Sequence, residues 1–247
     1  MGRNSAYTKV NDSLHIVKIP VKDFRIQYLD KAKKSAGVSN YFNCGYFGNF
    51  SESGDCFTMP VGNLKCDITP STVDSNALSY FEGACEFGRI ASNKLICETS
   101  KVKTAQFHNK KVSTLLVYEK GVAQIEAVNF VPNDVTYAVS GAPVILNGSD
   151  VSWKCVIAPQ GWDASIARAT WHGFLGLKTD GYMYYVGMKT ATPNLFASSE
   201  AYKRLKPYGF VDVIKVDGGG SYIFNLDGKN IACDAENRRI NNVGRCL

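Results

Sequence analysis

The stretch Phe210-Val-Asp-Val-Ile-Lys-Val-Asp217-Gly-Gly-Gly-Ser221 carries the strongest structural signal in this chain. Its first part, 210–216, is an apolar run that predicts a largely buried strand. Three glycines follow the carboxylate, although each glycine loses more backbone entropy on folding than any other residue. Such a run is favoured where the backbone needs positive φ angles or where another group approaches closely, and its N–H groups can line an anion-binding nest. The alternative is a flexible turn in which Asp217 is only a polar turn residue.

The composition of the chain predicts a single globular domain over residues 1–247. The 247 residues are 45% hydrophobic and 20% charged, which is enough for a sizeable core. The 13 Tyr and 13 Phe favour a sheet-rich structure. The sequence has no internal repeat and no change of composition typical of a linker, so we expect no second domain.

Turn dipeptides predict several β-hairpins. Asp180-Gly181 and Asp227-Gly228 each lie between two runs rich in apolar and aromatic residues, and this dipeptide suits a type I′ turn. Asn147-Gly148 is a third strong turn signal. The partly alternating runs 14–20 and 24–29 predict an opening pair of strands. We therefore expect a mixed, mainly antiparallel sheet.

The clearest helix signal covers residues 199–208. Ser198 or Ser199 can cap its N-terminus, Glu200 suits the positive end of the helix dipole, and Pro207 stops the helix. Residues 48–70, in contrast, are rich in Gly, Ser, Asp and Pro, and we expect a long loop of the kind that often forms a lid or binding segment. Together these elements predict an α+β fold with a few helices flanking the sheet.

Charge and cysteine content narrow the expected partners and location. The net charge of +6 mildly favours an anionic partner, but the basic residues are dispersed and give no strong nucleic-acid signal. No two of the eight Cys have C-x-x-C spacing, which argues against a structural zinc site. Residues 1–12 lack the apolar core of a signal peptide, and no stretch is apolar enough to cross a membrane. We therefore expect a cytoplasmic protein with mostly reduced Cys; removal of a leader would imply secretion instead.

Five short segments combine glycine with side chains that can carry chemistry. They are Asn43-x-Gly45-x-Phe47, Leu146-Asn147-Gly148, Ala167-Arg168-Ala-Thr170-Trp-His172-Gly173, Asp217-Gly-Gly-Gly-Ser221 and Arg238-Arg239-Ile-Asn241-Asn242. In this order and spacing they resemble the phosphodiester glycosidase family, which includes N-acetylglucosamine-1-phosphodiester alpha-N-acetylglucosaminidases and many bacterial and phage members. The resemblance is good over 140–245, fair over 40–50 and loose elsewhere. Ala169 departs from the family pattern, which tends to place Thr directly after Arg.

The resemblance implies a reaction and a set of site residues in a chain of bacterial or phage type. The family hydrolyses the glycosidic bond of a sugar-1-phosphodiester and releases a free sugar and a phosphomonoester. By resemblance, the catalytic candidates are Asp217, Arg168 and His172, and the partner is an anionic sugar-phosphate or nucleotide-like small molecule. The substrate-binding candidates are Asn43, Gly45, Asn147, Thr170, Gly218, Gly219, Gly220 and Ser221. No cofactor is expected, and a divalent metal stays open because carboxylate and Asn oxygens can bind a hard cation.

These residue types suit the implied chemistry. The planar guanidinium of Arg168 can hold a phosphate through two parallel hydrogen bonds. Asp217 can act as a base, as a nucleophile or as an acceptor for sugar hydroxyls, and His172 can act as an acid. Glycoside cleavage usually uses two carboxylates, and Asp163 and Glu82 are candidates for the second. Because a phosphate leaving group is a weak base, one carboxylate with cationic support can suffice.

Structural roles compete with these assignments. Asn43 can bond local backbone, Asn147-Gly148 can be only a turn, and Arg168 and His172 can belong to structural contacts. Cys44 could act as a nucleophile, but nothing near it in the sequence lowers the pKa of its thiol, which favours a packed side chain.

Two other functions compete with hydrolysis. The chain can be a non-catalytic module that sequesters a phosphorylated sugar or nucleotide, and recovery of intact ligand after long incubation would show this. It can also be a structural or host-interaction protein that uses the fold as a scaffold, because a fold alone does not secure a function. An occluded pocket would favour the scaffold.

Overall fold

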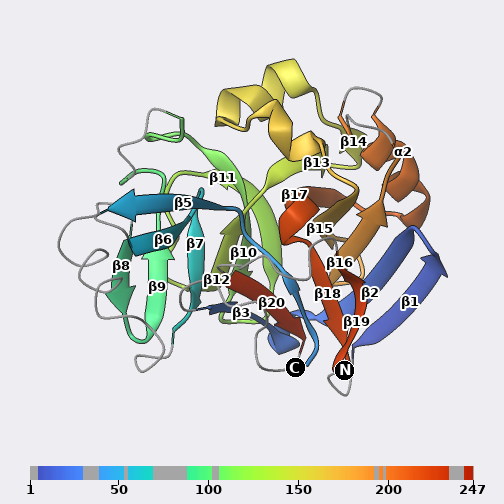
Figure 1. Ribbon diagram of the computed structural model, residues 1–247, viewed down its shortest axis with the longest axis horizontal. Coiled ribbons are helices and arrows are strands. Elements are labelled where there is room, and N and C mark those ends of the chain that lie inside the picture. The colour runs from blue at the N-terminus through green and yellow to red at the C-terminus, as the bar shows by residue number, and fades with distance from the viewer. Residues whose placement is uncertain are drawn as a thin grey trace.

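The computed structural model describes residues 5–29, 39–52, 55–68, 88–101, 106–191, 195–196, 199–233 and 242–246. These residues form two large β-sheets that pack face to face, and a separate two-stranded hairpin lies beside them (Figure 1). The hairpin consists of β5 (Phe47–Glu52) and β6 (Asp55–Pro60).

The first sheet, called sheet A, has seven strands. All of its neighbouring strands pair in the antiparallel direction. Their order is β1 (Ala6–Asn11), β2 (Leu14–Pro20), β16 (Tyr182–Lys189), β15 (Trp171–Leu177), β17 (Asp212–Gly218), β13 (Ala142–Leu146) and β14 (Ser149–Asp150).

The second sheet, called sheet B, has eleven strands and contains both pairing directions. Its main path is β11 (Ala123–Val128), β10 (Val112–Tyr118), β12 (Val135–Ser140), β7 (Leu64–Asp67), β3 (Phe24–Tyr28), β20 (Asn242–Cys246), β4 (Tyr41–Asn43), β18 (Ile223–Leu226) and β19 (Lys229–Cys233). A branch from β7 adds β9 (Lys94–Cys97) and then β8 (Gly88–Ala91). β3 and β7 are parallel, whereas the other described pairs are antiparallel.

The structure is a β-rich sandwich, so the predicted α+β class is wrong. The described helical parts are all short: α2 (Glu200–Leu205), the 3-10 turns η1 (Val21–Asp23), η5 (Ala158–Gln160), η6 (Ala164–Ala167), η7 (Lys206–Tyr208) and η8 (Gly219–Ser221), and the π-helical turn η4 (Trp153–Ile157). The helix predicted over 199–208 is α2 followed by η7. Because the two sheets bury their apolar faces against each other, the main core needs no layer of helices. No helix in the described ranges has the length and apolar character needed to span a bilayer.

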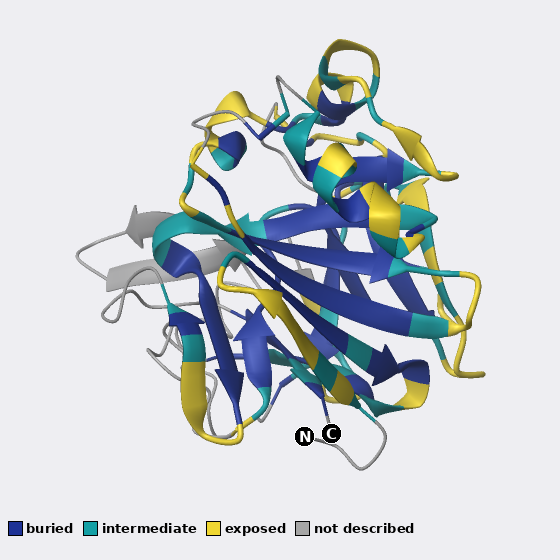
Figure 2. Cartoon of the chain, turned by 90° about the vertical axis from the view of Figure 1, so that its right-hand side faces the viewer, coloured by how far each residue is buried: buried dark blue, intermediate teal, exposed yellow. Residues whose placement is uncertain are grey.

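The main core lies between the two sheets. Ile214 and Val216 enter it from sheet A, and Phe42 enters it from sheet B. Phe42 stacks on Tyr185 of β16 with ring centroids 3.8 Å apart, so the two sheets meet directly at this pair. A smaller core on the other face of sheet A packs under α2 and includes Leu205. Figure 2 shows the central strands as buried and much of the loops and helical turns as exposed.

The hairpins predicted from turn dipeptides are present. Asp180-Gly181 joins β15 to β16, Asp227-Gly228 joins β18 to β19, and Asn147-Gly148 joins β13 to β14. In the last two turns both central residues have positive φ, as a type I′ turn requires. In the first turn only Gly181 has a positive φ, so the type I′ prediction is wrong there. The turn dipeptides nevertheless predicted all three strand pairs correctly.

Two other local predictions are wrong. The runs 14–20 and 24–29 contain strands, but these do not pair, because β2 lies in sheet A and β3 lies in sheet B with η1 between them. The described residues within 48–70 do not form one long loop, since they contain most of the β5–β6 hairpin and the whole of β7. β2 pairs with the distant β16, and β7 pairs with β12, β3 and β9, so these pairings depend on contacts that a local pattern does not contain. β5 and β6, in contrast, form a local hairpin.

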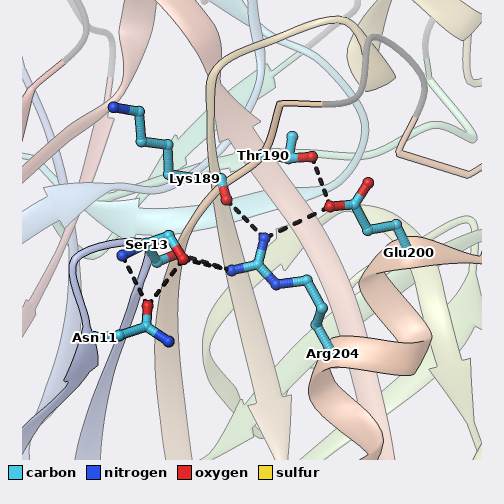
Figure 3. Close-up of polar contacts among 6 residues, drawn as sticks. All are labelled: Asn11, Ser13, Lys189, Thr190, Glu200 and Arg204. Atoms are coloured by element: carbon cyan, nitrogen blue, oxygen red, sulfur yellow. Dashed lines mark hydrogen bonds and ion pairs between the residues drawn. The ribbon is translucent and has the colours of Figure 1, made fainter.

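A polar network anchors α2 to sheet A (Figure 3). Arg204 donates from Nη1 to the Lys189 carbonyl at 2.6 Å and from Nη2 to the Ser13 carbonyl at 3.1 Å. Glu200 lies 3.6 Å from the same guanidinium and accepts a hydrogen bond from the Thr190 hydroxyl at 2.8 Å. The helix is therefore fixed to the turn before β2 and to the end of β16.

Candidate functional site

A pocket of about 300 Å³ opens at the C-terminal end of β17. Its walls come from the chain after β4, from the segment that includes η6, and from the glycines that follow β17. The lining residues are Tyr46, Ser165, Ile166, Arg168, Ala169, Lys215, Asp217, Gly218, Gly219 and Gly220. The pocket thus brings together Asp217, Arg168 and the three glycines singled out in the sequence, and it adds Lys215 and Tyr46.

β17 determines where the ionisable side chains point. Successive side chains of a strand point to opposite faces, so Ile214 and Val216 enter the core between the sheets. Lys215 and Asp217 point the other way and line the pocket. Lys215 is buried, and Asp217 at the strand end is half-buried. One strand therefore supplies a cation and a carboxylate to the same cavity.

Hydrogen bonds orient the Asp217 carboxylate. The Gly218 amide donates to Oδ1 at 2.8 Å, and Asn43 Nδ2 donates to Oδ2 at 3.3 Å. The Asp217 amide donates to the Cys44 carbonyl at 3.0 Å, which ties the end of β17 to the chain after β4. Burial raises the pKa of Asp217, while the Lys215 charge and these donors act in the opposite direction. A raised pKa makes this carboxylate a stronger base near neutral pH.

Asn43 and Gly45 support the site without lining the pocket. Asn43 is fully buried, and its Nδ2 also donates to the Ser221 carbonyl at 2.6 Å. The Gly45 amide donates to Asn242 Oδ1 at 2.6 Å, and a Cβ on Gly45 would lie 3.0 Å from that oxygen. Asn242 is the one residue of the predicted segment 238–242 that lies within the described residues. These contacts hold the chain between β4 and the pocket wall.

Packing and backbone geometry give the glycines a structural reason. A Cβ on Gly218 would lie 2.7 Å from the Trp171 carbonyl oxygen on neighbouring β15. Gly219 has a φ of 58°, in the left-handed region that favours glycine. Both residues line the pocket together with Gly220, whereas Ser221 is buried outside the lining. The run therefore has the positive φ that its sequence predicts, and its close approach is to the backbone of β15; close approach to an anion stays a prediction.

Arg168 lies exposed at the rim of the pocket, directly after η6. Its amide donates to the Ser165 carbonyl at 3.0 Å. None of the ion pairs between described residues involves its guanidinium. Because a guanidinium carries five N–H donors in a planar fork, Arg168 can offer a bidentate contact to an anion in the pocket.

Thr170 and Asn147 lie outside the lining. Thr170 is exposed, and its carbonyl accepts from the Thr190 amide at 2.9 Å. Asn147 lies in the β13–β14 turn, where its amide donates to Asp212 Oδ1 at 2.9 Å. Asp212 begins β17 and Asp217 lies near its end, so the structure places Asn147 at the far end of the strand from the pocket.

Among the described residues Asp217 is the one carboxylate that lines the pocket. Asp163 is exposed and caps η6 by accepting from the Ser165 amide at 2.8 Å, which lowers the pKa of Asp163. Glu82 lies outside the described residues. Cys44 is fully buried, and burial raises the pKa of its thiol well above the usual range, which fits a packed side chain.

His172 is fully buried on β15 and does not line the pocket. Neither ring nitrogen has a hydrogen-bond partner among the described residues. Burial lowers the pKa of His172 to about 3, and the Lys215 charge acts in the same direction, whereas the nearby Ala169 backbone opposes it. The ring is therefore neutral at pH 7 and does not donate a proton as an imidazolium.

Lys215 is a cationic residue of the pocket that was not predicted from the sequence. Its Nζ donates to Tyr46 Oη at 2.7 Å and to the Val216 carbonyl at 3.1 Å. Burial lowers the pKa of Lys215 to about 8, while the Asp217 charge acts in the opposite direction. One signal for it was present in the sequence. Lys215 interrupts an apolar strand two residues before Asp217, and residues at this spacing point to the same face of a sheet.

The pocket combines the two cations Arg168 and Lys215 with the single carboxylate of Asp217. The surplus positive charge favours an anionic ligand, and the carboxylate can accept a proton beside it. Within the described part of the chain, no group of three or more His, Cys, Asp or Glu could hold a metal ion. The arrangement is therefore that of an anion site with one proton acceptor beside it.

Comparisons with known proteins identify a similar fold. The catalytic domain of zebrafish N-acetylglucosamine-1-phosphodiester alpha-N-acetylglucosaminidase, solved in a form auto-inhibited by its pro-peptide, aligns with 99% of this chain and 82% of that chain. The TM-score is 0.59 and the sequence identity is 14%. The two proteins share a fold.

A hypothetical protein from Synechocystis aligns with 98% of this chain and 61% of that chain, with a TM-score of 0.46 and 10% identity. No protein-family model and no curated protein match the sequence.

Proposed function

We propose that this protein is a phosphodiester glycosidase, a hydrolase that cleaves the glycosidic bond of a sugar-1-phosphodiester and releases a free sugar and a phosphomonoester. The observation that carries the proposal is the half-buried Asp217 carboxylate in a pocket that Arg168 and Lys215 make cationic. The fold shared with a catalytic domain named for this activity supports it. The partner is accordingly an anionic sugar-phosphate or nucleotide-like small molecule.

In the proposed reaction Asp217 activates a water molecule. Its carboxylate accepts a proton from the water, whose oxygen bonds to the anomeric carbon of the sugar. The bond from this carbon to the phosphate oxygen breaks, and its electron pair stays on the phosphate. Arg168 binds the phosphate and stabilises the charge that develops there. Because the leaving phosphate is a weak base, the step needs no general acid, which fits the single carboxylate among the described lining residues.

The test is hydrolysis of a panel of sugar-1-phosphodiesters and nucleotide-sugars, with products identified by mass spectrometry. We expect Asp217→Asn to lower kcat about 100-fold or more, because a positioned base contributes roughly 10²–10⁴-fold. The substitution keeps the size of the side chain and can still accept from the Gly218 amide. Asp163→Asn is the matched control, since this carboxylate caps η6 and does not line the pocket. Full activity in Asp217→Asn would contradict the proposal.

A non-catalytic binding module is the second candidate function. The observation in its favour is the single carboxylate among the described lining residues, because glycoside hydrolysis usually uses two. Such a module would sequester a phosphorylated sugar or nucleotide and leave it intact. Recovery of unchanged diester after prolonged incubation, together with binding that Arg168→Ala weakens in calorimetry, would favour this module over an enzyme.

A further inference from the structure

Lys215 is a fully buried cation without a carboxylate in direct contact among the described residues. Its exposed fraction is 1%, and none of the ion pairs between described residues includes it. The Asp217 carboxylate, two residues further on, attracts the ammonium but does not form an ion pair with it. A buried charge is strongly unfavourable unless a counter-charge and hydrogen bonds balance it. A ligand anion in the pocket would supply the contact that the described residues do not.

The donors of Lys215 are only partly used by these protein atoms. An ammonium carries three N–H donors and no acceptor. Two of them serve Tyr46 Oη and the Val216 carbonyl, which leaves one donor on a nitrogen whose side chain lines the pocket. Buried donors normally have a partner, because an unpaired one loses its hydrogen bonds to water without replacement. The third donor is therefore available to an oxygen atom of a ligand.

The two cations of the pocket differ in depth. Arg168 is exposed at the rim, whereas Lys215 projects from a central strand of sheet A and is buried. Tyr46 is itself buried, and its hydroxyl accepts a hydrogen bond from the Lys215 ammonium. This contact holds the ammonium in position at the pocket. A phosphate that entered this cavity would meet the guanidinium at the mouth and the ammonium at the floor.

We propose that Lys215 binds an oxygen of the ligand's phosphate at the floor of the pocket and that Tyr46 positions the ammonium for this contact. This inference deepens the proposed function and rests on it for the identity of the ligand. During hydrolysis Lys215 keeps its proton and stabilises the negative charge that the phosphate gains when the bond to the anomeric carbon breaks. The proton released by the attacking water goes to Asp217 and then to solvent.

A second cavity on the molecule provides a matched control. It has a volume of about 290 Å³ and is lined by Lys65, Arg89, Lys94 and Glu119 among others. Here Lys94 pairs with the Asp67 carboxylate, and Glu119 lines the same cavity. Carboxylates therefore already lie near these cations. Replacing Lys65 removes a lysine charge from the second cavity and leaves the pocket around Asp217 unchanged.

The experiment measures the binding of inorganic phosphate by isothermal titration calorimetry at pH 7, with glucose as the uncharged control. We expect Lys215→Met to weaken phosphate binding at least ten-fold, and Lys65→Met to change it less than two-fold. Met keeps the length and apolar stem of the side chain, so folding should persist; the unfolding temperature of each variant checks this. If Lys215→Met does not fold, Lys215→Gln takes its place, because Gln still donates to Tyr46 without carrying a charge.

Tyr46 is tested through its coupling to Lys215. Tyr46→Phe removes the acceptor of the ammonium, so we expect weaker phosphate binding in the wild-type background. In the Lys215→Met background the same substitution should have no further effect, because the ammonium that Tyr46 positions is already absent. A purely structural role of Tyr46 would instead weaken binding by the same factor in both backgrounds.

The outcomes separate this inference from the proposed function. Phosphate binding that does not change in Lys215→Met, or wild-type protein that binds no phosphate, would overturn the role of Lys215. Hydrolysis of diesters with unchanged phosphate binding in Lys215→Met would overturn the inference and leave the glycosidase intact. Phosphate binding that depends on Lys215, without hydrolysis of any diester, would support the inference and contradict the glycosidase.

Discussion

Burial acts on Asp217 and Lys215 in opposite directions, and it moves their two pKa values toward each other. The pKa of Asp217 is raised and that of Lys215 is lowered to about 8. The proposed step needs Asp217 ionised and Lys215 protonated. Two further ionisable side chains near Lys215 do not titrate close to pH 8, because burial raises the pKa of Tyr46 and lowers that of His172 to about 3.

We therefore predict a bell-shaped dependence of kcat/KM on pH. Activity should rise as Asp217 loses its proton, above the usual range of an aspartate, and should fall through about pH 8 as Lys215 loses its own. Lys215→Gln should have lower activity and no decline near pH 8, because Gln does not titrate. The measurement is kcat/KM from pH 4 to 10 for both proteins. An unchanged alkaline decline in Lys215→Gln would assign that decline to another group.

The residues of the site were visible in the sequence to different degrees. Asp217 and its glycines stood out because three consecutive glycines are unfavourable in entropy unless the backbone needs their freedom, and Arg168 stood out through its own short motif. Lys215 was missed because its position in the apolar run predicts burial but not its hydrogen bond to Tyr46, which comes from a distant part of the chain. His172 has a catalytic residue type, but its complete burial is a property of the folded sheet.

The contacts of α2 lead to a prediction at the scale of single elements. Arg204→Ala removes the donors that join the helix to the Lys189 and Ser13 carbonyls. We expect the free energy of unfolding to fall by about 1–3 kcal/mol, because hydrogen bonds from a charged donor contribute roughly 1.5–3 kcal/mol each and this side chain is partly exposed. Urea unfolding measures the change. Lys203→Ala, on the exposed side of the same helix, should stay within about 0.5 kcal/mol.

Equal effects of Arg204→Ala and Lys203→Ala would show that the network in Figure 3 does not hold the helix in place. Hydrogen exchange of the α2 amides provides an independent check, since loss of the anchor should speed exchange in α2 before it affects the central strands of sheet A. The central strands are buried and therefore open only with the whole sandwich.

Elements were predictable where local chemistry specifies them. The Asp227-Gly228 and Asn147-Gly148 turns determine their hairpins through positive φ at two consecutive residues. The partner of β2 was not predictable in the same way, because β16 lies far along the chain and the strand that follows β2 joins the other sheet. Ser199 precedes α2 as expected, but its side chain makes no capping hydrogen bond.

At the scale of the whole molecule, the candidate site joins the two sheets. Asp217 belongs to sheet A, whereas Asn43, which donates to its carboxylate, belongs to sheet B. The Asp217 amide also donates to the Cys44 carbonyl beyond the end of β4. The α+β prediction failed at this scale because aromatic content and helix signals do not reveal that two sheets cover each other. The geometry of the carboxylate therefore depends on the packing of the sandwich.

Phe42 tests this dependence because it lies one residue before Asn43 and stacks on Tyr185 of the opposite sheet. We expect Phe42→Ala to lower the free energy of unfolding by about 3–5 kcal/mol, the usual range when a buried Phe is truncated and leaves a cavity. Phosphate affinity and kcat should fall as well, since β4 loses the contact that fixes Asn43 against Asp217. Val122→Ala, at an exposed position in the β10–β11 turn, is the control and should alter neither stability nor binding. Chemical denaturation measures the change in stability, and calorimetry measures phosphate binding. If Phe42→Ala is strongly destabilised but still binds phosphate with wild-type affinity, the site does not depend on this contact between the sheets.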